Sequence, residues 1–231
     1  MQLEVWIATK PSLTHTENED RAVVGDEVFA DVAGVEHRHL PVPGLLVAVD
    51  GLGGHASGHV ASHVAAKLFA AADVPTDEAG AAQLLELADR TLHDAMQTDP
   101  ELQGMGATVA LTSVLDGTLI TANAGDTSAW RYTDGHLEPL TVSDRIAGSQ
   151  IGQCLGATHE LVPHVQTAEL HPGERLLLAS DGLTDVVGLE TLEQVLGGPI
   201  DHAVIDLLDR VEQARFPDDV TIVVAEVQPT A

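Results

Sequence analysis

Two short apolar runs that each end on Asp-Gly constrain the fold of this chain most. The runs are "LLVAVDGLGG", which contains Asp50 and Gly51, and "RLLLASDGLTD", which contains Asp181 and Gly182. A short, almost wholly apolar run is typical of a strand that is buried on both faces. Such a strand cannot hide a charge at its end, so the aspartate needs a partner where the strand leaves the core. The pattern therefore favours a layered fold with a polar site at its strand ends.

Length and composition indicate one globular domain. The chain has 231 residues, of which 44% are hydrophobic but only 3% aromatic, so we expect a core of aliphatic side chains and alanine. No linker, repeat or low-complexity tract divides it. We therefore expect residues 1–231 to form a single domain.

The charge balance excludes some partners. Lys and Arg number 10 against 36 Asp and Glu, which gives a net charge of −26. Such a surface repels nucleic acid and anionic membranes, although it is compatible with cation binding, and most of the excess is expected to be solvated. Cys154 is the single cysteine, and no stretch resembles a signal peptide or a membrane span. We expect a cytoplasmic protein, with a monomer favoured.

Strands account for most of the expected elements. They are predicted over "LEVWIAT", "GLLVAV", "ERLLLAS" and "VTIVVAEV", with another within residues 22–35. The Asp-Gly pairs at 116–117 and 134–135 each lie between two strand-like runs, which predicts two β-hairpins. Hairpins imply antiparallel pairing.

Three helices are expected as well. They cover residues 59–72, 77–97 and 201–215. Val60, Val64 and Leu68 form the expected apolar stripe of the first helix. Asp77 is the expected N-cap of the second. Residues 145–172 are predicted to be irregular, and the whole order suggests an α+β domain with two packed sheets and helices outside.

Further carboxylates lie beside the predicted strands. Asp126 lies in "TANAGDTS", Asp20 ends "NED", and Asp218 lies in "FPDDVT". If these positions converge with Asp50 and Asp181, the carboxylates repel one another unless cations bind them. Oxygen ligands select Mg²⁺ or Mn²⁺, and a glycine after the aspartate lets a backbone carbonyl approach the ion.

A dinucleotide-binding loop is the first alternative. "GLGGHA" fits the G-x-G-x-x-[GA] fingerprint. However, a second helix follows the first where a parallel strand is required, and Asp50 would repel a pyrophosphate. The match is therefore expected to be accidental.

A zinc site is the second alternative. His55, His59 and His63 recur every four residues and could share a helix face, but the glutamate of H-E-x-x-H is missing. A surface histidine stripe explains His59 and His63 better. His37 and His39 are expected to lie in a loop.

Together, the motifs resemble those of the metal-dependent Ser/Thr protein phosphatases of type 2C. In the family's order, "NED" is similar to N-E-D, "VAVDGLGGHASGHVAS" to D-G-M-G-G-H-x-x-G-x-x-A-S, "GATVAL" to G-T-T, "NAGDTSAW" to G-D-S-R, "LLLASDGLTDVV" to L-x-S-D-G-L-x-D, and "PDDVTIVV" to D-N-[IV]-T. The matches run from residue 18 to 224. The resemblance implies a four-layer α-β-β-α sandwich, in which two central antiparallel sheets are flanked by helix pairs, with residues 145–172 as a mobile flap.

The resemblance also implies residue roles. The metal ligands would be Asp20, Asp50, the Gly51 carbonyl, Asp126, Asp181 and Asp218. Asp50 would bridge two Mn²⁺ or Mg²⁺ ions, Asp126 would hold a third, weaker ion, and His55 would be the general acid. The implied reaction is hydrolysis of phosphoserine or phosphothreonine on proteins by a water that the two ions share. The alternatives are a pseudophosphatase that acts as a regulatory binding module and a small-molecule phosphoesterase.

Three positions depart from the family pattern. His15 stands where the family usually has an arginine that grips the phosphate, Ser128 replaces the arginine of G-D-S-R, and Asp219 replaces the asparagine of D-N-x-T. Histidine cannot offer a bidentate fork, and its charge depends on pH. We therefore expect weakened substrate capture, unless Lys10 or Arg21 fills the role.

Overall fold

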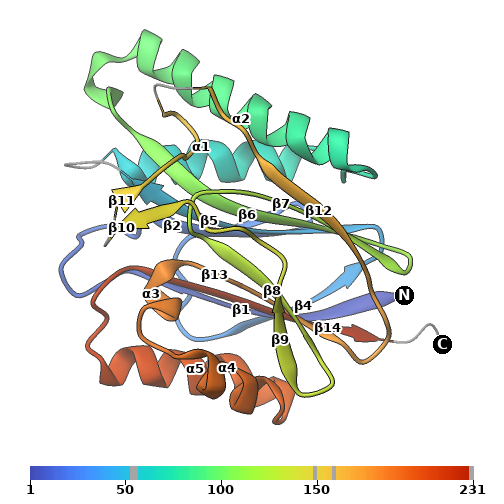
Figure 1. Cartoon of the computed structure of the whole chain (residues 1–231). Coiled ribbons are helices and arrows are strands. Elements are labelled where there is room, and N and C mark those ends of the chain that lie inside the picture. Colours follow the sequence, from blue (N-terminus) through green and yellow to red (C-terminus); the bar gives the residue numbers. More distant parts are fainter. Residues whose placement is uncertain (53–56, 148–149, 158–159, 229–231) are drawn as a thin grey trace.

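The protein is a four-layer sandwich in which two antiparallel sheets lie between two layers of helices (Figure 1). The structure is a computed structural model that describes residues 1–52, 57–147, 150–157 and 160–228. The α+β, α-β-β-α architecture expected from the sequence is confirmed.

The two sheets have six strands each, and every strand pair in them is antiparallel among the described residues. Sheet 1 has the order β4-β1-β14-β13-β8-β9 and contains β1 (Gln2–Lys10), β4 (Glu36–Pro41), β8 (Ser128–Thr133), β9 (His136–Pro139), β13 (Arg175–Ala179) and β14 (Val220–Gln228). Sheet 2 has the order β12-β7-β6-β5-β2-β3 and contains β2 (Asp20–Val24), β3 (Glu27–Phe29), β5 (Gly44–Leu52), β6 (Gly106–Leu115), β7 (Thr118–Ala124) and β12 (His164–Glu169). A short separate hairpin consists of β10 (Arg145–Ala147) and β11 (Gln150–Ile151).

Helices cover the outer face of each sheet (Figure 1). Sheet 2 is covered by α1 (Gly58–Ala71) and α2 (Glu78–Thr98), and sheet 1 by α4 (Leu189–Leu196) and α5 (Ile200–Gln213); α3 (Asp181–Thr184) and the 3₁₀ helix η1 (Pro100–Leu102) are single turns. None of the described helices is long and apolar enough to cross a membrane.

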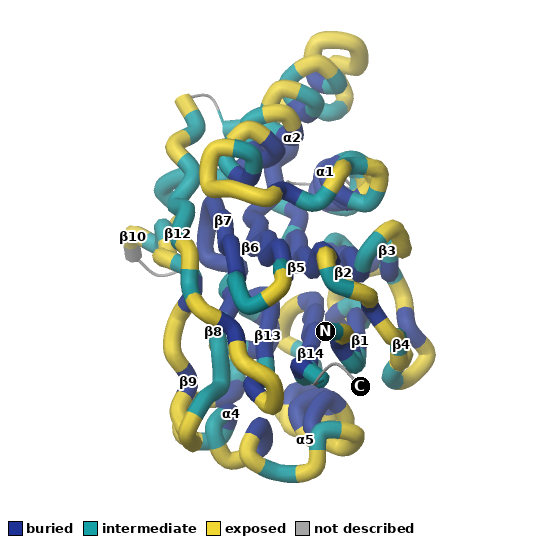
Figure 2. Tube along the Cα trace, turned by 90° about the vertical axis from the view of Figure 1, so that its right-hand side faces the viewer, coloured by how far each residue is buried: buried dark blue, intermediate teal, exposed yellow. Residues whose placement is uncertain are grey.

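Alternating side chains build three apolar layers. In β14, Val223 and Ala225 face the other sheet, whereas Ile222 and Val224 face α4 and α5. Figure 2 shows the buried strands in the middle of the molecule and the exposed residues on the helices and loops around them. The sheets are thus buried on both faces, which explains the almost wholly apolar runs in the sequence.

The local signals for turns and caps are confirmed. Gly117, Asp134 and Gly135 have φ of 78°, 51° and 88°, which places them in the left-handed region that tight hairpin turns require. The side chain of Asp77 accepts a hydrogen bond of 2.7 Å from the amide of Gly80, as an N-cap does.

The predicted apolar stripe of α1 is wrong by one position. Val60, Val64 and Leu68 are only partly buried, and the face against the sheet is centred on Ala61 and Ala65. Phe69 continues this buried face one turn after Ala65, so Val60, Val64 and Leu68 flank the contact.

Two edge strands were not predicted. Residues 145–172 are not irregular throughout, because they contain the β10–β11 hairpin and β12, which pairs with β7. The loop predicted for His37 and His39 is wrong too, since both lie in β4, which pairs with β1. Edge strands expose one side and carry polar or charged residues, so neither sequence shows an apolar run.

Candidate metal centre

Asp20 and Asp50 face each other at one end of sheet 2. They are Cα partners in the pairing of β2 with β5. Leu46 and Ala48 of β5 point into the space between the sheets, and Asp50, in step with them, points the same way. The same alternation from Ala22 directs Asp20 into that space. The apolar layer between the sheets therefore ends on two carboxylates.

Sheet 1 brings further carboxylates to this end of the sandwich. Asp181 follows β13 as the first residue of α3, Asp218 comes just before β14, and Asp126 lies between β7 and β8. A cavity of about 260 Å³ is lined by His15, Glu19, Asp50, Gly51, Leu52, Asp126, Ile151, Asp181, Pro217 and Asp218. Ile151 of β11 and Asp181 of α3 contribute to its lining, and these two elements lie opposite the two chain termini in Figure 1. Of the five predicted aspartates, Asp50, Asp126, Asp181 and Asp218 line this cavity. Asp20 does not line it but is the strand partner of Asp50.

Close backbone packing explains the Asp-Gly pairs. A Cβ atom on Gly51 would collide with the carbonyl oxygen of Gly58, and one on Gly182 would collide with that of Asp219. Only glycine fits at either position. The backbone next to each aspartate is therefore held tightly against a neighbouring segment, which fixes where the two carboxylates point.

The crowded carboxylates raise one another's pKa. Burial raises the pKa of Asp50 well above its usual range, and the negative charges of Asp20, Asp181, Asp218 and Asp126 raise it further. Burial also raises the pKa of Asp181, to about 6. Oδ1 of Asp20 is buried without a hydrogen-bond partner among the described residues. This unpartnered oxygen and the all-oxygen donor set fit a hard divalent cation such as Mn²⁺ or Mg²⁺.

Ser180 positions Asp20 across the two sheets, and the sequence analysis missed it. Its hydroxyl donates a hydrogen bond of 2.6 Å to Oδ2 of Asp20, and it accepts one of 2.9 Å from the amide of Thr221. Asp20 and Ser180 are 160 positions apart in the chain. A serine that ends an apolar run was the available signal.

Arg145 is a second residue that the sequence analysis missed. Its guanidinium donates hydrogen bonds to Asp126 (2.9 Å), Asp181 (3.0 Å) and Asp185 (2.8 Å). The hydrogen bond to Asp185 and then that to Asp126 raise the pKa of Arg145. Asp144, the neighbouring residue, accepts a 2.8 Å hydrogen bond from the amide of Gly125 and so fixes the start of β10. A cation from β10 thus lies among the carboxylates.

His15 lines the cavity and is held by Asp219. Nδ1 of His15 lies 3.0 Å from Oδ1 of Asp219, whose carboxylate also accepts 2.6 Å hydrogen bonds from the amides of Ser12 and Glu19. Burial lowers the pKa of His15, but the hydrogen bond to Asp219 and the charges of Asp219, Glu19 and Asp218 outweigh it, so that pKa is raised overall. Asp219 therefore anchors the segment around His15, whereas Asp218 lines the cavity.

Arg21 does not line the cavity. Its guanidinium donates hydrogen bonds of 2.6 Å to the main-chain oxygens of Asn18 and Asp20, and the residue is buried. These bonds make it a brace for the N-E-D segment. The hypothesis that Arg21 replaces the family's arginine thus has no support in this geometry.

Of His55, His59 and His63, the structure describes only the last two. His55, the predicted general acid, lies outside the described residues. Nε2 of His59 lies 3.2 Å from Oε2 of Glu17. Burial lowers the pKa of His63. The dinucleotide alternative is disfavoured, because β5 is followed by the antiparallel helix pair and then by β6, which pairs with it antiparallel.

Two antiparallel sheets between helix pairs, with carboxylates from both sheets at one end, define the architecture of a type 2C phosphatase domain. The chain belongs to the SpoIIE/PP2C-type family, since residues 45–228 match the model of Stage II sporulation protein E (SpoIIE). The resemblance seen in the motifs is confirmed.

Relatives and solved structures agree with this family. The serine/threonine protein phosphatase PstP of Mycobacterium tuberculosis is 31% identical over 208 residues, which are 79% of this chain and 40% of PstP. The chain therefore spans less than half the length of PstP. A putative protein phosphatase 2C-type of Streptococcus pyogenes is 24% identical over 77% of this chain and 83% of its own length. The crystal structure of PstP/Ppp has a TM-score of 0.81 at 27% identity and covers 99% of this chain and 100% of that one. Another structure holds the PstP catalytic domain in complex with 2 manganese ions, with a TM-score of 0.79 at 27% identity over 99% of this chain and 100% of that chain.

Proposed function

We propose that this chain hydrolyses phosphoserine and phosphothreonine on proteins in a reaction that depends on Mn²⁺ or Mg²⁺. The observation that carries the proposal is the convergence of carboxylates from both sheets on one cavity, beside the unpartnered oxygen of Asp20. PstP, a relative of the same fold, is named a serine/threonine phosphatase, and its catalytic domain binds manganese. A phosphorylated protein is the corresponding substrate.

In this proposal the metal ligands are Asp20, Asp50, the Gly51 carbonyl, Asp126, Asp181 and Asp218. When bound, the ions would supply an activated water and neutralise phosphoryl oxygens. Ser180 keeps one carboxylate in place across the two sheets. His15, at the wall of the cavity, would donate a hydrogen bond to the phosphate, and His55 keeps its predicted role as the general acid that protonates the leaving alkoxide.

The same proposal includes the domain extent, the cellular location and the oligomeric state. Residues 1–231 would form one catalytic domain, with 145–172 as its flap, and the protein would act in cytoplasmic signalling as a monomer. Size-exclusion chromatography and cell fractionation test these points.

The proposal predicts that metal and Asp50 are both essential. Chelation with EDTA should abolish hydrolysis of p-nitrophenyl phosphate and of a phosphoserine peptide, and Mn²⁺ or Mg²⁺ should restore it. Asp50→Asn should lower kcat/KM at least about 100-fold, because metal ions stabilise the transition state by several kcal/mol. Asp209→Asn, on the exposed side of α5, is the matched control and should retain wild-type rates.

The outcomes separate the alternatives. Full activity in a metal-free sample, or near wild-type turnover of Asp50→Asn, would overturn the proposal. Turnover of neither substrate with bound metal would favour the pseudophosphatase. Turnover of p-nitrophenyl phosphate and small phosphoesters, but not of phosphopeptides, would favour the small-molecule phosphoesterase.

A further inference from the structure

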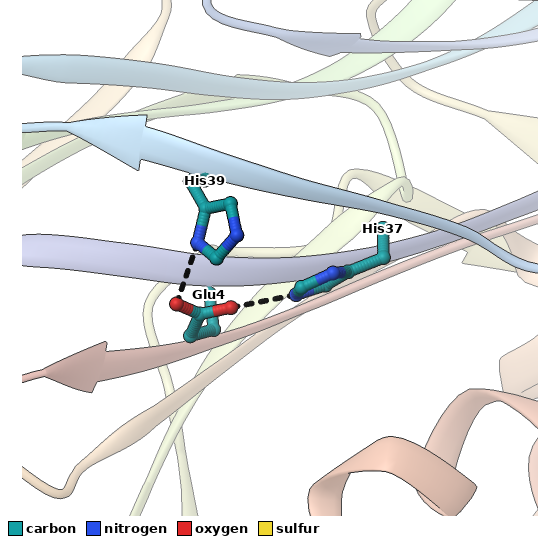
Figure 3. A group of neighbouring side chains, drawn as sticks. All are labelled: Glu4, His37 and His39. Carbon is teal, nitrogen blue, oxygen red and sulfur yellow. Dashed lines mark hydrogen bonds and ion pairs between the residues drawn. The ribbon is translucent and has the colours of Figure 1, made fainter.

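Glu4, His37 and His39 form a cluster on the outer face of sheet 1, outside the carboxylate cavity (Figure 3). Nε2 of His37 lies 2.6 Å from Oε2 of Glu4, and Nδ1 of His39 lies 2.6 Å from Oε1. One possible ligand atom from each residue lies within 4.8 Å of the other two. Each oxygen of the Glu4 carboxylate therefore contacts one imidazole nitrogen.

The strand register creates this cluster. In the pairing of β1 with β4, Glu4 lies opposite His39, and Trp6 lies opposite His37. Residues two apart on a strand share a face, so both imidazoles stand on the side of Glu4. Leu40, which follows His39 in β4, points into the layer between the sheets. The two histidines consequently face outward.

Neighbouring rings and burial hold the cluster in place. The ring of Trp6 stacks on that of His37, with 4.7 Å between centroids, and the rings of His37 and His39 are 5.0 Å apart. The side chain of Glu4 is only 18% exposed, whereas those of His37 and His39 are 41% and 67% exposed. The carboxylate is thus fixed, while the imidazoles remain open to an ion from solvent.

The next carboxylate on this face is already paired. Glu226 of β14 lies opposite Glu4 in the register. Its Oε2 accepts a 2.8 Å hydrogen bond from Nε of Arg175. Arg175 therefore compensates the charge of Glu226, and Glu4 is the carboxylate that remains for the two histidines.

We propose that Glu4, His37 and His39 bind a divalent ion of the zinc type. Two imidazole nitrogens and one carboxylate oxygen suit Zn²⁺, whereas Mg²⁺ prefers oxygen ligands alone. Ligand bonds of about 2.0–2.2 Å in a tetrahedral site separate the ligand atoms by roughly 3.3–3.5 Å. With one Glu4 oxygen as the ligand, the 2.6 Å histidine contact to that oxygen has to open by about 1 Å or less. The other separations, which are within 4.8 Å, have to close to that distance, and the exposed imidazoles permit both changes. Water would complete the coordination, and the ion would tie the edge strand β4 to β1.

Zinc titration of the full chain tests the site. Metal-stripped protein is titrated with Zn²⁺ in excess Mg²⁺, which competes at the carboxylate cavity, and binding is followed by calorimetry. The wild type should bind one Zn²⁺ more than the double variant His37→Ala/His39→Ala. Glu4→Gln should weaken that site by more than the 10–100-fold that loss of an outer-shell partner costs. At a zinc concentration 100 times Kd, the wild-type Tm should rise by roughly 5–10 °C relative to the double variant.

A matched control and a direct signal keep the test decisive. The control His136→Ala/His202→Ala removes two exposed imidazoles from other elements and should bind zinc like the wild type. In the wild type, the imidazole NMR signals of His37 and His39 should shift as the site fills. Equal zinc stoichiometry in wild type and the His37/His39 variant, or unchanged signals of these two histidines, would overturn the site and leave two histidine–Glu4 ion pairs. The NMR readout does not depend on how any variant folds.

Discussion

Among the single residues of the cavity, His15 is the one whose chemistry is expected to determine substrate capture. It lies at the cavity wall where the family usually has an arginine, and its bond to Asp219 leaves Nε2 as the ring nitrogen that could contact a phosphate. A neutral imidazole donates at most one hydrogen bond, while a guanidinium offers two with a fixed charge. Substrate capture should therefore depend on the charge state of this ring.

We expect His15→Arg to lower KM at neutral pH with little change in kcat. A charged hydrogen bond contributes about 1.5–3 kcal/mol, and the phosphate charge is present in both ground and transition states. In the wild type, KM should be low at acid pH and rise as pH passes through the raised pKa of His15, because the imidazolium then loses its proton. Steady-state kinetics measure both effects from about one pH unit below an ordinary histidine pKa to about two units above it, because the pKa of His15 is raised.

His136→Arg serves as the control, since it adds the same side chain at an exposed position on β9. An equal drop in KM for both variants would mean that added positive charge anywhere is sufficient. An unchanged KM for His15→Arg would place the phosphate contact elsewhere.

The sequence predicts the carboxylates of the site better than the residues that orient them. Asp50 and Asp181 end apolar runs, so their position at a strand end is readable from the sequence alone. Ser180 meets Asp20 only through the packing of two sheets, and Arg145 reaches Asp181 from the β10 segment. Such contacts between distant segments have no local signature.

At the scale of elements, the β10–β11 hairpin is connected to the carboxylate cavity through Arg145. The guanidinium bonds to Asp126 and Asp181, which are two of the proposed metal ligands, and also to Asp185. A cation at those oxygens has to compete with the guanidinium. The hairpin is thus poised to influence metal affinity.

Arg145→Ala should increase the affinity for Mn²⁺ at the site that includes Asp126. Loss of one charged hydrogen bond of about 1.5–3 kcal/mol corresponds to roughly a 10-fold or greater gain. Isothermal titration with Mn²⁺ measures the change. Arg131→Ala removes a guanidinium that bonds to Glu138 and the main-chain oxygen of Glu169 and does not line the cavity. It is the control and should leave the affinity unchanged. Weaker Mn²⁺ binding by Arg145→Ala would contradict the competition.

Elements with a strong local sequence signal were predicted, whereas the edge strands β4 and β12 and the short helix α4 were not. The hairpin turns at Gly117 and Gly135 follow from Asp-Gly pairs, and the N-cap of α2 follows from Asp77. In contrast, β4 and β12 expose one face and have no apolar run, and the eight-residue α4 is too short for a clear period. Their formation depends on pairing with sheets that the chain builds elsewhere.

At the scale of the whole molecule, the layered architecture could be predicted but the strand order could not. The last strand, β14, does not close an edge of sheet 1; it lies between β1 and β13 in the middle. The first and last strands of the chain therefore pair along their full length, from Gln2 with Gln228 to Lys10 with Val220. Apolar periodicity reports burial of a strand and carries no information on its neighbour.

The buried carboxylates make the stability of the whole molecule depend on pH. In the metal-free protein, burial raises the pKa of Asp20 to about 8 and that of Asp181 to about 6. Below the ordinary aspartate pKa of about 4, both states hold these protons. Between about pH 4 and 8 the unfolded chain has released protons that the folded protein still holds, so the free energy of unfolding falls as pH rises. Above that range the loss is complete.

Thermal unfolding in EDTA should therefore give a Tm that decreases from pH 5 to pH 8. The shift for Asp181 alone corresponds to about 3 kcal/mol from pH 4 upwards. About half of that falls between pH 5 and 8, which is roughly 3–6 °C for a chain of this size. With excess Mn²⁺ the trend should reverse, because metal binding requires ionised ligands and grows stronger as pH rises.

General repulsion within a chain of net charge −26 also lowers Tm with pH, but about 1 M salt screens exposed charges and leaves the buried cluster largely unscreened. Asp181→Asn should flatten the decline in EDTA at high salt, whereas the exposed Asp209→Asn should not. A Tm in EDTA and high salt that stays constant or rises across this range would show that these carboxylates do not share one enclosed site.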